Sequence, residues 1–475
     1  MSDSSLPIII QGGMGVGISN WRLARAVSSQ GELGVVSGTA IDAMLVRRLQ
    51  DGDSGGHVRR AMAAFPLPDV AAPATARFFI DGGKAADRPY VMLPMYRVGA
   101  SPARERITML AAFVEVWLAK EGHDGAVGIN VLTKVQFPNL AILYGAMLAG
   151  VEYVLMGAGI PKEIPGILDA LATHGVATMR LDVEGVAPDD APLLTLDPSV
   201  HWNGATAPQI TRPKFVAIVA SNSLATMLAR KSSGRVDGFV VEAPTAGGHN
   251  APPRGAMQLN TVGEPLYGER DVVDFAKLGE IGLPFWVAGG AGSPGALRDA
   301  LDAGAQGIQV GTLFAYCEES GMAPEYRDQI VAAAVAGDVS VFTDPLASPT
   351  GYPFKVVHWP DEPVEAMASR DRVCDLGYLR TAFRRDNGRI DYRCPAEPVD
   401  TYLTKGGKLE DTVGRKCLCN ALMADAGHAQ VRGGGVVEAP LITSGDDLAS
   451  MATFLSGRTQ YSARDVISYL RGAES

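Results

Sequence analysis

The chain has 475 residues, of which 47% are hydrophobic and 20% are charged, a balance typical of a globular enzyme with a large core. Its 42 basic and 52 acidic residues give a formal net charge of -10, so nucleic acid and anionic membranes are not expected partners. The sequence has no apolar stretch of the ~18 residues needed to span a membrane, and its first residues lack a signal-peptide pattern. We therefore expect a cytoplasmic protein.

Two segments of the chain match each other position by position. Residues 147–157 and 301–311 each contain a helix end, a glycine stop, a short apolar run and a final glycine. Residues 235–241 carry the same strand pattern. Repeats of this kind predict parallel strands that are joined by crossover helices.

Eight short apolar segments are predicted to form these strands. They span residues 7–10, 33–36, 126–130, 152–156, 215–221, 237–242, 284–288 and 306–310. Eight parallel strands with intervening helices fit an α/β fold of the TIM (β/α)8 barrel class. An open, doubly wound sheet is the alternative, since the number of strands is hard to establish from one sequence.

The repeat pattern also predicts how the chain is divided. We expect the barrel to span residues 1–340, with insertions near residues 43–125 and 176–213, the second of which contains a small hairpin. After residue 340 the pattern changes to spaced prolines followed by polar helices. Residues 341–475 are therefore expected to form a C-terminal helical extension or subdomain.

A histidine follows two glycines shortly after one predicted strand. The apolar run ends at Glu242, and Gly247 and Gly248 directly precede His249. Two glycines allow the backbone to pass close to a flat ligand, and an imidazole titrates near neutral pH. We therefore expect His249 to be a catalytic base. The alternative is a loop histidine with satisfied hydrogen bonds.

Glycine concentrates after the seventh and eighth predicted strands. In TIM barrels these two loops commonly bind phosphate, because backbone N–H groups at helix N-termini can hold the dianion. The predicted phosphate-binding residues are Ala288, Gly289, Gly290, Gly311 and Thr312.

A further glycine cluster, at residues 12–17, follows the first predicted strand. It is not a dinucleotide fingerprint, because the second strand ends in Ser37 and Gly38 rather than in an acidic residue. We expect Gly13 and Met14 to pack beneath a flat cofactor. A tight turn that caps the barrel is the alternative.

Two polar side chains end other predicted strands. Asn130 ends the third strand, and its amide could bind the edge of a cofactor ring. Glu242 ends the sixth strand, where it could meet the polar rim of the cofactor or pair with a neighbouring strand end.

Several of these segments together resemble the nitronate monooxygenase family, formerly the 2-nitropropane dioxygenases. The superfamily also contains flavin-dependent enoyl-acyl-carrier-protein reductases. The resemblance implies an FMN-binding TIM barrel, with Gly247 and Gly248 near the flavin ring and His249 matching the catalytic histidine. The chain departs from the family at residues 250–255, in its insertions and in its long C-terminal part. The matching segments are residues 7–14 (PIIIQGGM), 128–130 (GIN), 156–161 (MGAGIP), 242–249 (EAPTAGGH), 288–293 (AGGAGS) and 309–314 (QVGTLF).

The resemblance implies an FMN-dependent oxidoreductase that oxidises a small nitronate or nitroalkane with O2. An NAD(P)H-dependent enoyl-thioester reductase that acts on an acyl carrier protein is the alternative, because it would use the same histidine and the same flavin. A third reading, from another class, is a non-catalytic flavin-binding scaffold. The sequence does not determine the oligomeric state.

Three residues are weaker candidates for substrate contacts. Arg254 could bind an anionic substrate group or a carrier phosphate, although a charged loop residue is often simply solvated. Tyr96 and Lys134 are more typical of structural residues.

Four of the five cysteines lie in the C-terminal part, with the spacing C-x19-C-x22-C-x-C. Cys374, Cys394, Cys417 and Cys419 could form a structural zinc site. Free or redox-active thiols and an iron–sulfur cluster are the alternatives. The fifth, Cys317, follows the eighth strand and is expected to be a core residue.

Overall fold

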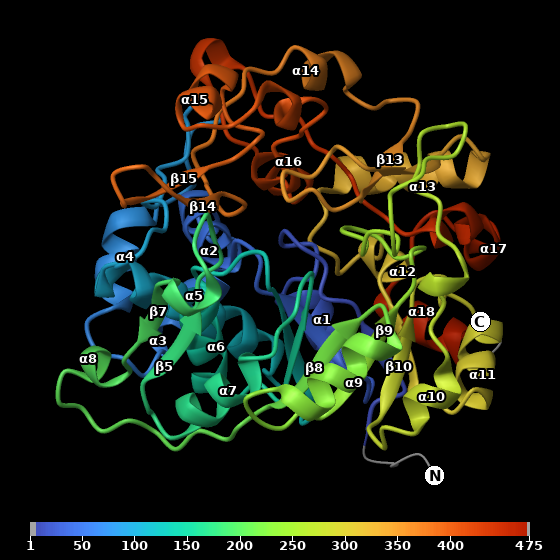
Figure 1. The fold of residues 1–475 in the computed structure, drawn as a ribbon, viewed down its shortest axis with the longest axis horizontal. Coiled ribbons are helices and arrows are strands. Elements are labelled where there is room, and N and C mark those ends of the chain that lie inside the picture. The colour runs from blue at the N-terminus through green and yellow to red at the C-terminus, as the bar shows by residue number, and fades with distance from the viewer. Residues whose placement is uncertain (1–5, 473–475) are drawn as a thin grey trace.

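The computed structural model describes residues 6–472. Its centre is an eight-stranded parallel sheet in the order β1-β11-β10-β9-β8-β4-β3-β2 (Figure 1). The two outermost strands of this order also meet, since Gln11 N donates to Leu33 O at 2.9 Å and Leu33 N donates to Ile9 O at 3.1 Å. The sheet therefore closes into a barrel. Its strands are β1 (Ile9–Gln11), β2 (Gly34–Ser37), β3 (Val127–Leu132), β4 (Tyr153–Gly157), β8 (Lys214–Val219), β9 (Gly238–Glu242), β10 (Phe285–Ala288) and β11 (Gly307–Val310).

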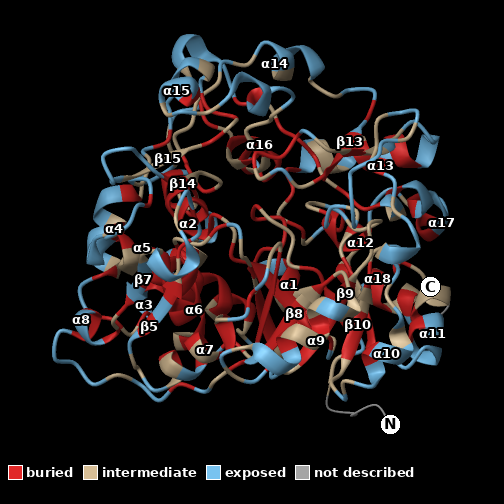
Figure 2. Ribbon diagram, in the orientation of Figure 1, coloured by how far each residue is buried: buried red, intermediate tan, exposed pale blue. Residues whose placement is uncertain are grey.

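All eight strands coincide with segments predicted from the sequence, so the TIM-barrel prediction is confirmed and the open-sheet alternative is wrong. Parallel strands that are covered on both faces need apolar side chains on both faces. Alternate residues of the strands fill the barrel interior, among them Val35, Leu155 and Trp286. Their neighbours face the surrounding helices in a second, larger core, which Figure 2 shows as buried strands within a more exposed shell.

Helices connect and cover these strands. They are α1 (Trp21–Ser28), α6 (Asn139–Leu148), α7 (Ile164–Ala172), α9 (Asn222–Lys231), α10 (Phe275–Gly279), α11 (Pro294–Asp302), α12 (Thr312–Ala315) and α13 (Pro324–Ala336). None of the helices in residues 6–472 is both long and apolar enough to cross a membrane.

The first of the two irregular stretches is helical. It contains α2 (Ile41–Gln50), α3 (His57–Ala63), α4 (Ala71–Phe78) and α5 (Pro102–Ala119). Helix α5 packs against α1 and α6 and thereby serves as the crossover helix between β2 and β3. This stretch is therefore partly a regular barrel unit.

The second irregular stretch contains the hairpin expected from the sequence. Strand β5 (Ala177–Arg180) pairs antiparallel with β7 (Leu193–Leu196). Between them lies β6 (Val183–Glu184), and the helix α8 (Ser199–Trp202) follows them.

The C-terminal part contains strands in addition to the predicted helices. Strands β12 (Ser340–Asp344) and β13 (Phe354–His358) form one antiparallel pair. Strands β14 (Thr381–Arg384) and β15 (Ile390–Arg393) form another, and β14 also pairs with β6. These strands are short and carry charged residues, so they lack the long apolar run of the barrel strands.

The C-terminal helices complete the fold. They are α14 (Val364–Ala368), α15 (Val399–Thr404), α16 (Leu418–Asp425), α17 (Met451–Leu455) and α18 (Ala463–Leu470). The last helix returns to the barrel and packs against α1 and α11, while α14, α15 and α16 lie above the barrel in Figure 1.

Candidate active site

A cavity of about 240 Å³ lies at the carboxyl ends of the barrel strands, where TIM barrels carry their active sites. Loops that follow β1, β3, β9, β10 and β11 form its lower wall. Residues of the C-terminal part form its roof, namely Phe354, Tyr378, Leu379, Leu418, Cys419 and Leu422. Most residues predicted to bind a cofactor line this cavity: Gly13, Met14, Asn130, Glu242, Gly247, Gly248, Ala288, Gly289, Gly311 and Thr312.

The loop after β1 lines the cavity and packs closely against Asn130. A Cβ atom at Gly13 would lie 2.2 Å from Cβ of Asn130, so only glycine fits there. The Asn130 side chain donates from Nδ2 to Gly13 O at 3.0 Å. Ser19 Oγ accepts from Met14 N at 2.8 Å and so fixes the loop from below.

Two buried acceptors in this cavity lack a protein partner. Among the described residues, Asn130 Oδ1 and Gln309 Oε1 have no hydrogen-bond donor. An unsatisfied buried acceptor costs free energy, so these atoms suit a ligand that donates N–H groups. Gln309 was not predicted as a site residue, although a polar side chain in the apolar strand β11 is visible in the sequence.

The first of the two loops predicted to bind phosphate contains two glycines in a left-handed conformation. Gly289 and Gly290 have φ values of 83° and 67°, in the left-handed region that glycine tolerates. Gly289 lines the cavity, whereas Gly290 lies next to it and is not part of the lining. Ser293 caps α11 by accepting from Ala296 N at 3.1 Å. This hydrogen bond fixes the start of α11 next to the loop.

A third segment, residues 444–447, reaches these loops from the C-terminal part. Gly445 N donates to Thr312 Oγ1 at 3.1 Å, and Asp446 N donates to Thr245 O at 3.0 Å. Asp447 lines the cavity and accepts from Gly292 N at 3.2 Å. Burial raises the pKa of Asp447, which favours the neutral carboxyl beside an anion site.

His249 is half-buried at the edge of the cavity. Its Nε2 lies 2.6 Å from Ser348 Oγ, and its ring meets Phe354 edge-on, with the centroids 4.8 Å apart. Burial and the positive charge of Lys134 lower the pKa of His249 to about 4. The imidazole is therefore neutral at neutral pH and can accept a proton. Ser348, which is fully buried, was not predicted from the sequence.

Glu242 lies at the end of β9 and lines the same cavity. Burial raises the pKa of its carboxyl group to about 7. The sequence left open whether Glu242 pairs with a neighbouring strand end. Within residues 6–472 its carboxyl group forms no hydrogen bond or ion pair, so this pair is not observed. Glu242 can therefore change its protonation state near neutral pH.

A second cavity of about 210 Å³ adjoins the first and shares His249 and Glu242 with it. Arg254 lines this outer cavity rather than the main one, and its Nη2 lies 3.3 Å from Ser223 Oγ. Asn250 is buried in the same wall, and its Oδ1 has no partner among the described residues. The outer cavity thus combines a guanidinium group with an unsatisfied amide oxygen.

The other two weaker candidates, Lys134 and Tyr96, have different surroundings. Lys134 stacks over the ring of Tyr352, with Nζ 4.5 Å from the centroid, and is close enough to affect His249. Tyr96 is buried away from the cavity, and its hydroxyl group lies 2.5 Å from Thr108 Oγ1. Tyr96 is therefore a structural residue, as expected.

The structure gathers the four C-terminal cysteines, for which the sequence left a zinc site, free thiols and an iron–sulfur cluster open. Cys374, Cys394, Cys417 and Cys419 line one small cavity behind the roof, and all are free thiols. Within residues 6–472, no group of three or more His, Cys, Asp or Glu side chains is arranged to hold a metal ion. Cys317 is buried in the core, as expected.

Similarity to solved structures is low along the whole chain. An enoyl-acyl-carrier-protein reductase FabK of Thermotoga maritima is 15% identical with a TM-score of 0.47, covering 98% of this chain and 92% of that one. A nitroalkane oxidase of Streptomyces ansochromogenes is 15% identical with a TM-score of 0.46, and the match covers 98% of this chain and 95% of that one. The enoyl reductase domain of MlnA, from the macrolactin biosynthesis cluster of Bacillus amyloliquefaciens, is 11% identical with a TM-score of 0.47. The match covers 98% of this chain and 95% of that one.

No curated protein matches the sequence. A family model does match the part of the chain that carries β9, β10, β11 and the histidine loop. Over residues 200–347 the chain matches the nitronate monooxygenase family, which confirms the resemblance seen in its sequence.

Proposed function

We propose that this protein is an FMN-dependent oxidoreductase that oxidises alkyl nitronates or nitroalkanes with O2. The observation that carries the proposal is the position of His249. Its neutral imidazole lies where a glycine-lined cavity meets a second, outer cavity. This arrangement suits a base that stands between a bound cofactor and an incoming substrate. The family match over residues 200–347 supports the same reaction class.

The residues of the main cavity fit FMN. The loops with Gly289 and Gly311 would hold its phosphate through backbone N–H groups. The loop at Gly13 lines the cavity next to Asn130, and the free oxygens of Asn130 and Gln309 can accept from ring N–H groups. When bound, FMN would supply the electron-transfer chemistry that no side chain of the protein can provide.

The side chains would carry out the proton chemistry. His249 would remove the α-proton of a nitroalkane. Its lowered pKa leaves the imidazole unprotonated at neutral pH, while it also makes the imidazole a weaker base than an ordinary histidine. Ser348 would hold the imidazole ring in place through its hydrogen bond to Nε2. Lys134 and Arg254 would favour the negatively charged nitronate over neutral competitors.

One observation also favours a second candidate, an NAD(P)H-dependent enoyl-thioester reductase. The outer cavity extends away from His249 toward Arg254, which could bind the phosphate of a carrier-linked acyl chain. In that reaction His249 would lie near the thioester carbonyl or the α-carbon.

The response of the flavin to nitronate and to pyridine nucleotides distinguishes these functions. The purified protein should be yellow and release FMN, and it should consume O2 with propyl nitronate in the absence of NADH and NADPH. Rapid anaerobic bleaching by a pyridine nucleotide, with no O2 uptake in the presence of nitronate, would establish the reductase instead. A colourless protein that FMN does not reconstitute would overturn both enzymatic proposals and leave a non-catalytic role.

A further inference from the structure

The four cysteines behind the roof of the main cavity form a cluster with no role in the proposed reaction. They come from three segments that are distant in the sequence. Cys374 lies between α14 and β14, Cys394 directly follows β15, and Cys417 and Cys419 lie at the start of α16. The fold brings all four to one cavity of about 10 Å³ and leaves them unpaired.

Two of these thiols, Cys374 and Cys394, line the same small cavity. The neighbouring Cys394 thiol lowers the pKa of Cys374, and the guanidinium group of Arg380 acts in the same direction. Cys374 is half-buried and can be reached from solvent, whereas Cys394 is only 6% exposed. The pair thus consists of one accessible sulfur beside a cation and one sheltered thiol, the arrangement of redox-sensitive cysteines.

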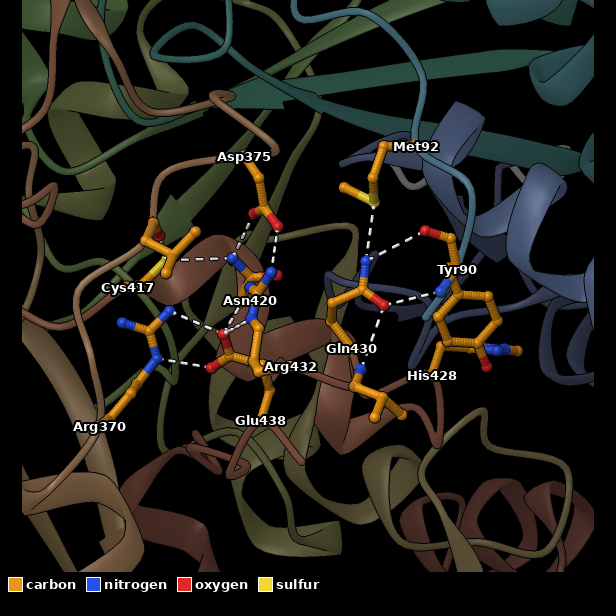
Figure 3. Close-up of polar contacts among 12 residues, drawn as sticks. Tyr90, Met92, Arg370, Asp375, Cys417, Asn420, His428, Gln430, Arg432 and Glu438 are labelled. Carbon is orange, nitrogen blue, oxygen red and sulfur yellow. Dashed lines mark hydrogen bonds and ion pairs between the residues drawn. The ribbon is translucent and has the colours of Figure 1, made fainter. Parts of the chain in front are cut away.

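A polar network braces the segments that carry these thiols (Figure 3). Asn420 Nδ2 donates to Asp375 Oδ1 at 2.8 Å and contacts Cys417 Sγ at 3.5 Å. Arg432 connects Asp375 to Glu438 through ion pairs. The segment after α14 and the start of α16 are therefore tied together next to the thiol pair.

The cluster also shares a wall with the main cavity. Leu379, Leu418 and Cys419 line both cavities. Tyr378 lines the main cavity and donates to Asp42 of α2, so it fastens the roof to the barrel. A covalent change at Cys374, four residues before Tyr378, would therefore act directly on the roof.

We propose that Cys374 and Cys394 form a redox-active pair that a hydroperoxide oxidises to a disulfide. The Cys374 thiolate attacks one peroxide oxygen and forms a sulfenic acid, and the other oxygen leaves as an alcohol or water. The Cys394 thiol then attacks the sulfenic sulfur, a disulfide bond forms, and water leaves. Two thiols are oxidised by two electrons and one peroxide bond is reduced. This site is independent of the oxidoreductase reaction proposed above.

The test uses the full chain, reduced, freed of reductant and treated with hydrogen peroxide. Thiol titration under denaturing conditions should show the loss of two thiols per chain, and peptide mapping should find Cys374 joined to Cys394. Dithiothreitol should restore both thiols. Cys317, which is fully buried, should stay reduced and serves as an internal control.

Variants distinguish this pair from the neighbouring thiols. Cys374→Ser and Cys394→Ser should abolish the disulfide, whereas Cys417→Ser should leave it intact. The proposal is overturned if the untreated protein contains about one equivalent of zinc or iron that Cys374→Ser loses. It is also overturned if peroxide joins a different pair or removes no thiols.

Discussion

The surroundings of His249 keep its imidazole neutral, so replacing this residue should remove a base from the site. Replacing His249 by alanine removes the proposed base but leaves the glycine-lined cavity in place. We expect turnover of a neutral nitroalkane to fall on the order of a hundredfold or more, as for the loss of a general base. A preformed nitronate, which needs no deprotonation, should be affected less. Oxygen uptake with both substrates measures the difference.

Ser348→Ala is the matched control for this variant. It keeps the imidazole but removes the hydrogen bond to Nε2, so it should cause a smaller loss than His249→Ala. Equal and unchanged rates in both variants would show that His249 is structural.

The lowered pKa of His249 predicts a pH profile. For a neutral nitroalkane, kcat/KM should rise with pH through a pKa of about 4 and stay level to neutral pH, because the imidazole must be deprotonated. An unperturbed histidine would instead place this rise near pH ~6.5. The same shift should lower the stability of the fold as pH falls from the unfolded value to the folded one, since the unfolded chain takes up the proton first. A rise centred near neutral pH would contradict the assignment.

Glu242 should make the folded protein less stable at alkaline pH. Its folded pKa of about 7 is above the ordinary value of 4.5, so the folded state loses stability as pH rises between these values. Glu242→Gln should therefore raise Tm at pH 8, by roughly 1 °C for each kcal/mol recovered. The gain should be much smaller at pH 5 and should vanish below about pH 4, where the carboxyl group is neutral in both the folded and the unfolded chain. A gain that is equal at both pH values would refute this account.

At the scale of elements, the loop after β1 is limited by its close approach to β3. Gly13→Ala would place a Cβ atom 2.2 Å from Asn130, so the loop must shift, at a cost of about 1–3 kcal/mol for overpacking. We expect a lower Tm and weaker FMN retention. Gly279→Ala, at a position with open space around it, is the control and should change neither. Flavin content after gel filtration and thermal unfolding measure both effects.

The barrel strands could be predicted from the sequence because of how they are covered. A strand such as β4 or β9 is buried on both faces, so it reads as a continuous apolar run that ends in glycine or a polar residue. Strands β14 and β15 are partly exposed and begin or end with arginine or threonine, so they give no such run. The sequence after residue 340 therefore predicts helices and gives no signal for these two strands.

The residues of the candidate site also differ in how clearly the sequence marks them. Residues at strand ends, such as Asn130 and Glu242, could be predicted because parallel strands bring their carboxyl ends to one rim. Ser348 reaches His249, and residues 444–447 reach the cavity, only through the return of the C-terminal part, and no local pattern marks that return. Whether the predicted residues bind FMN stays a prediction.

At the scale of the whole molecule, the C-terminal part places an acidic residue beside the phosphate loops. Asp447 accepts from Gly292 N, and its pKa is raised by burial. Its ionisation at high pH should oppose a bound phosphate. Asp447→Asn keeps an acceptor oxygen but removes the charge, so it should bind FMN on the order of tenfold more tightly at pH 8, equivalent to about 1.4 kcal/mol. Titration of the flavin-free protein checks this, and weaker binding by the variant would refute it.

The contact between residues 444–447 and the loops after β9 and β11 has a consequence for biosynthesis. During translation all eight barrel strands leave the ribosome before the last segment of the binding cavity exists. A nascent chain that stops before residue 440 contains all eight strands, yet it lacks the segment that contacts Thr245 and Thr312. If the predicted loops bind FMN as proposed, we expect binding only after synthesis has reached residues 444–447.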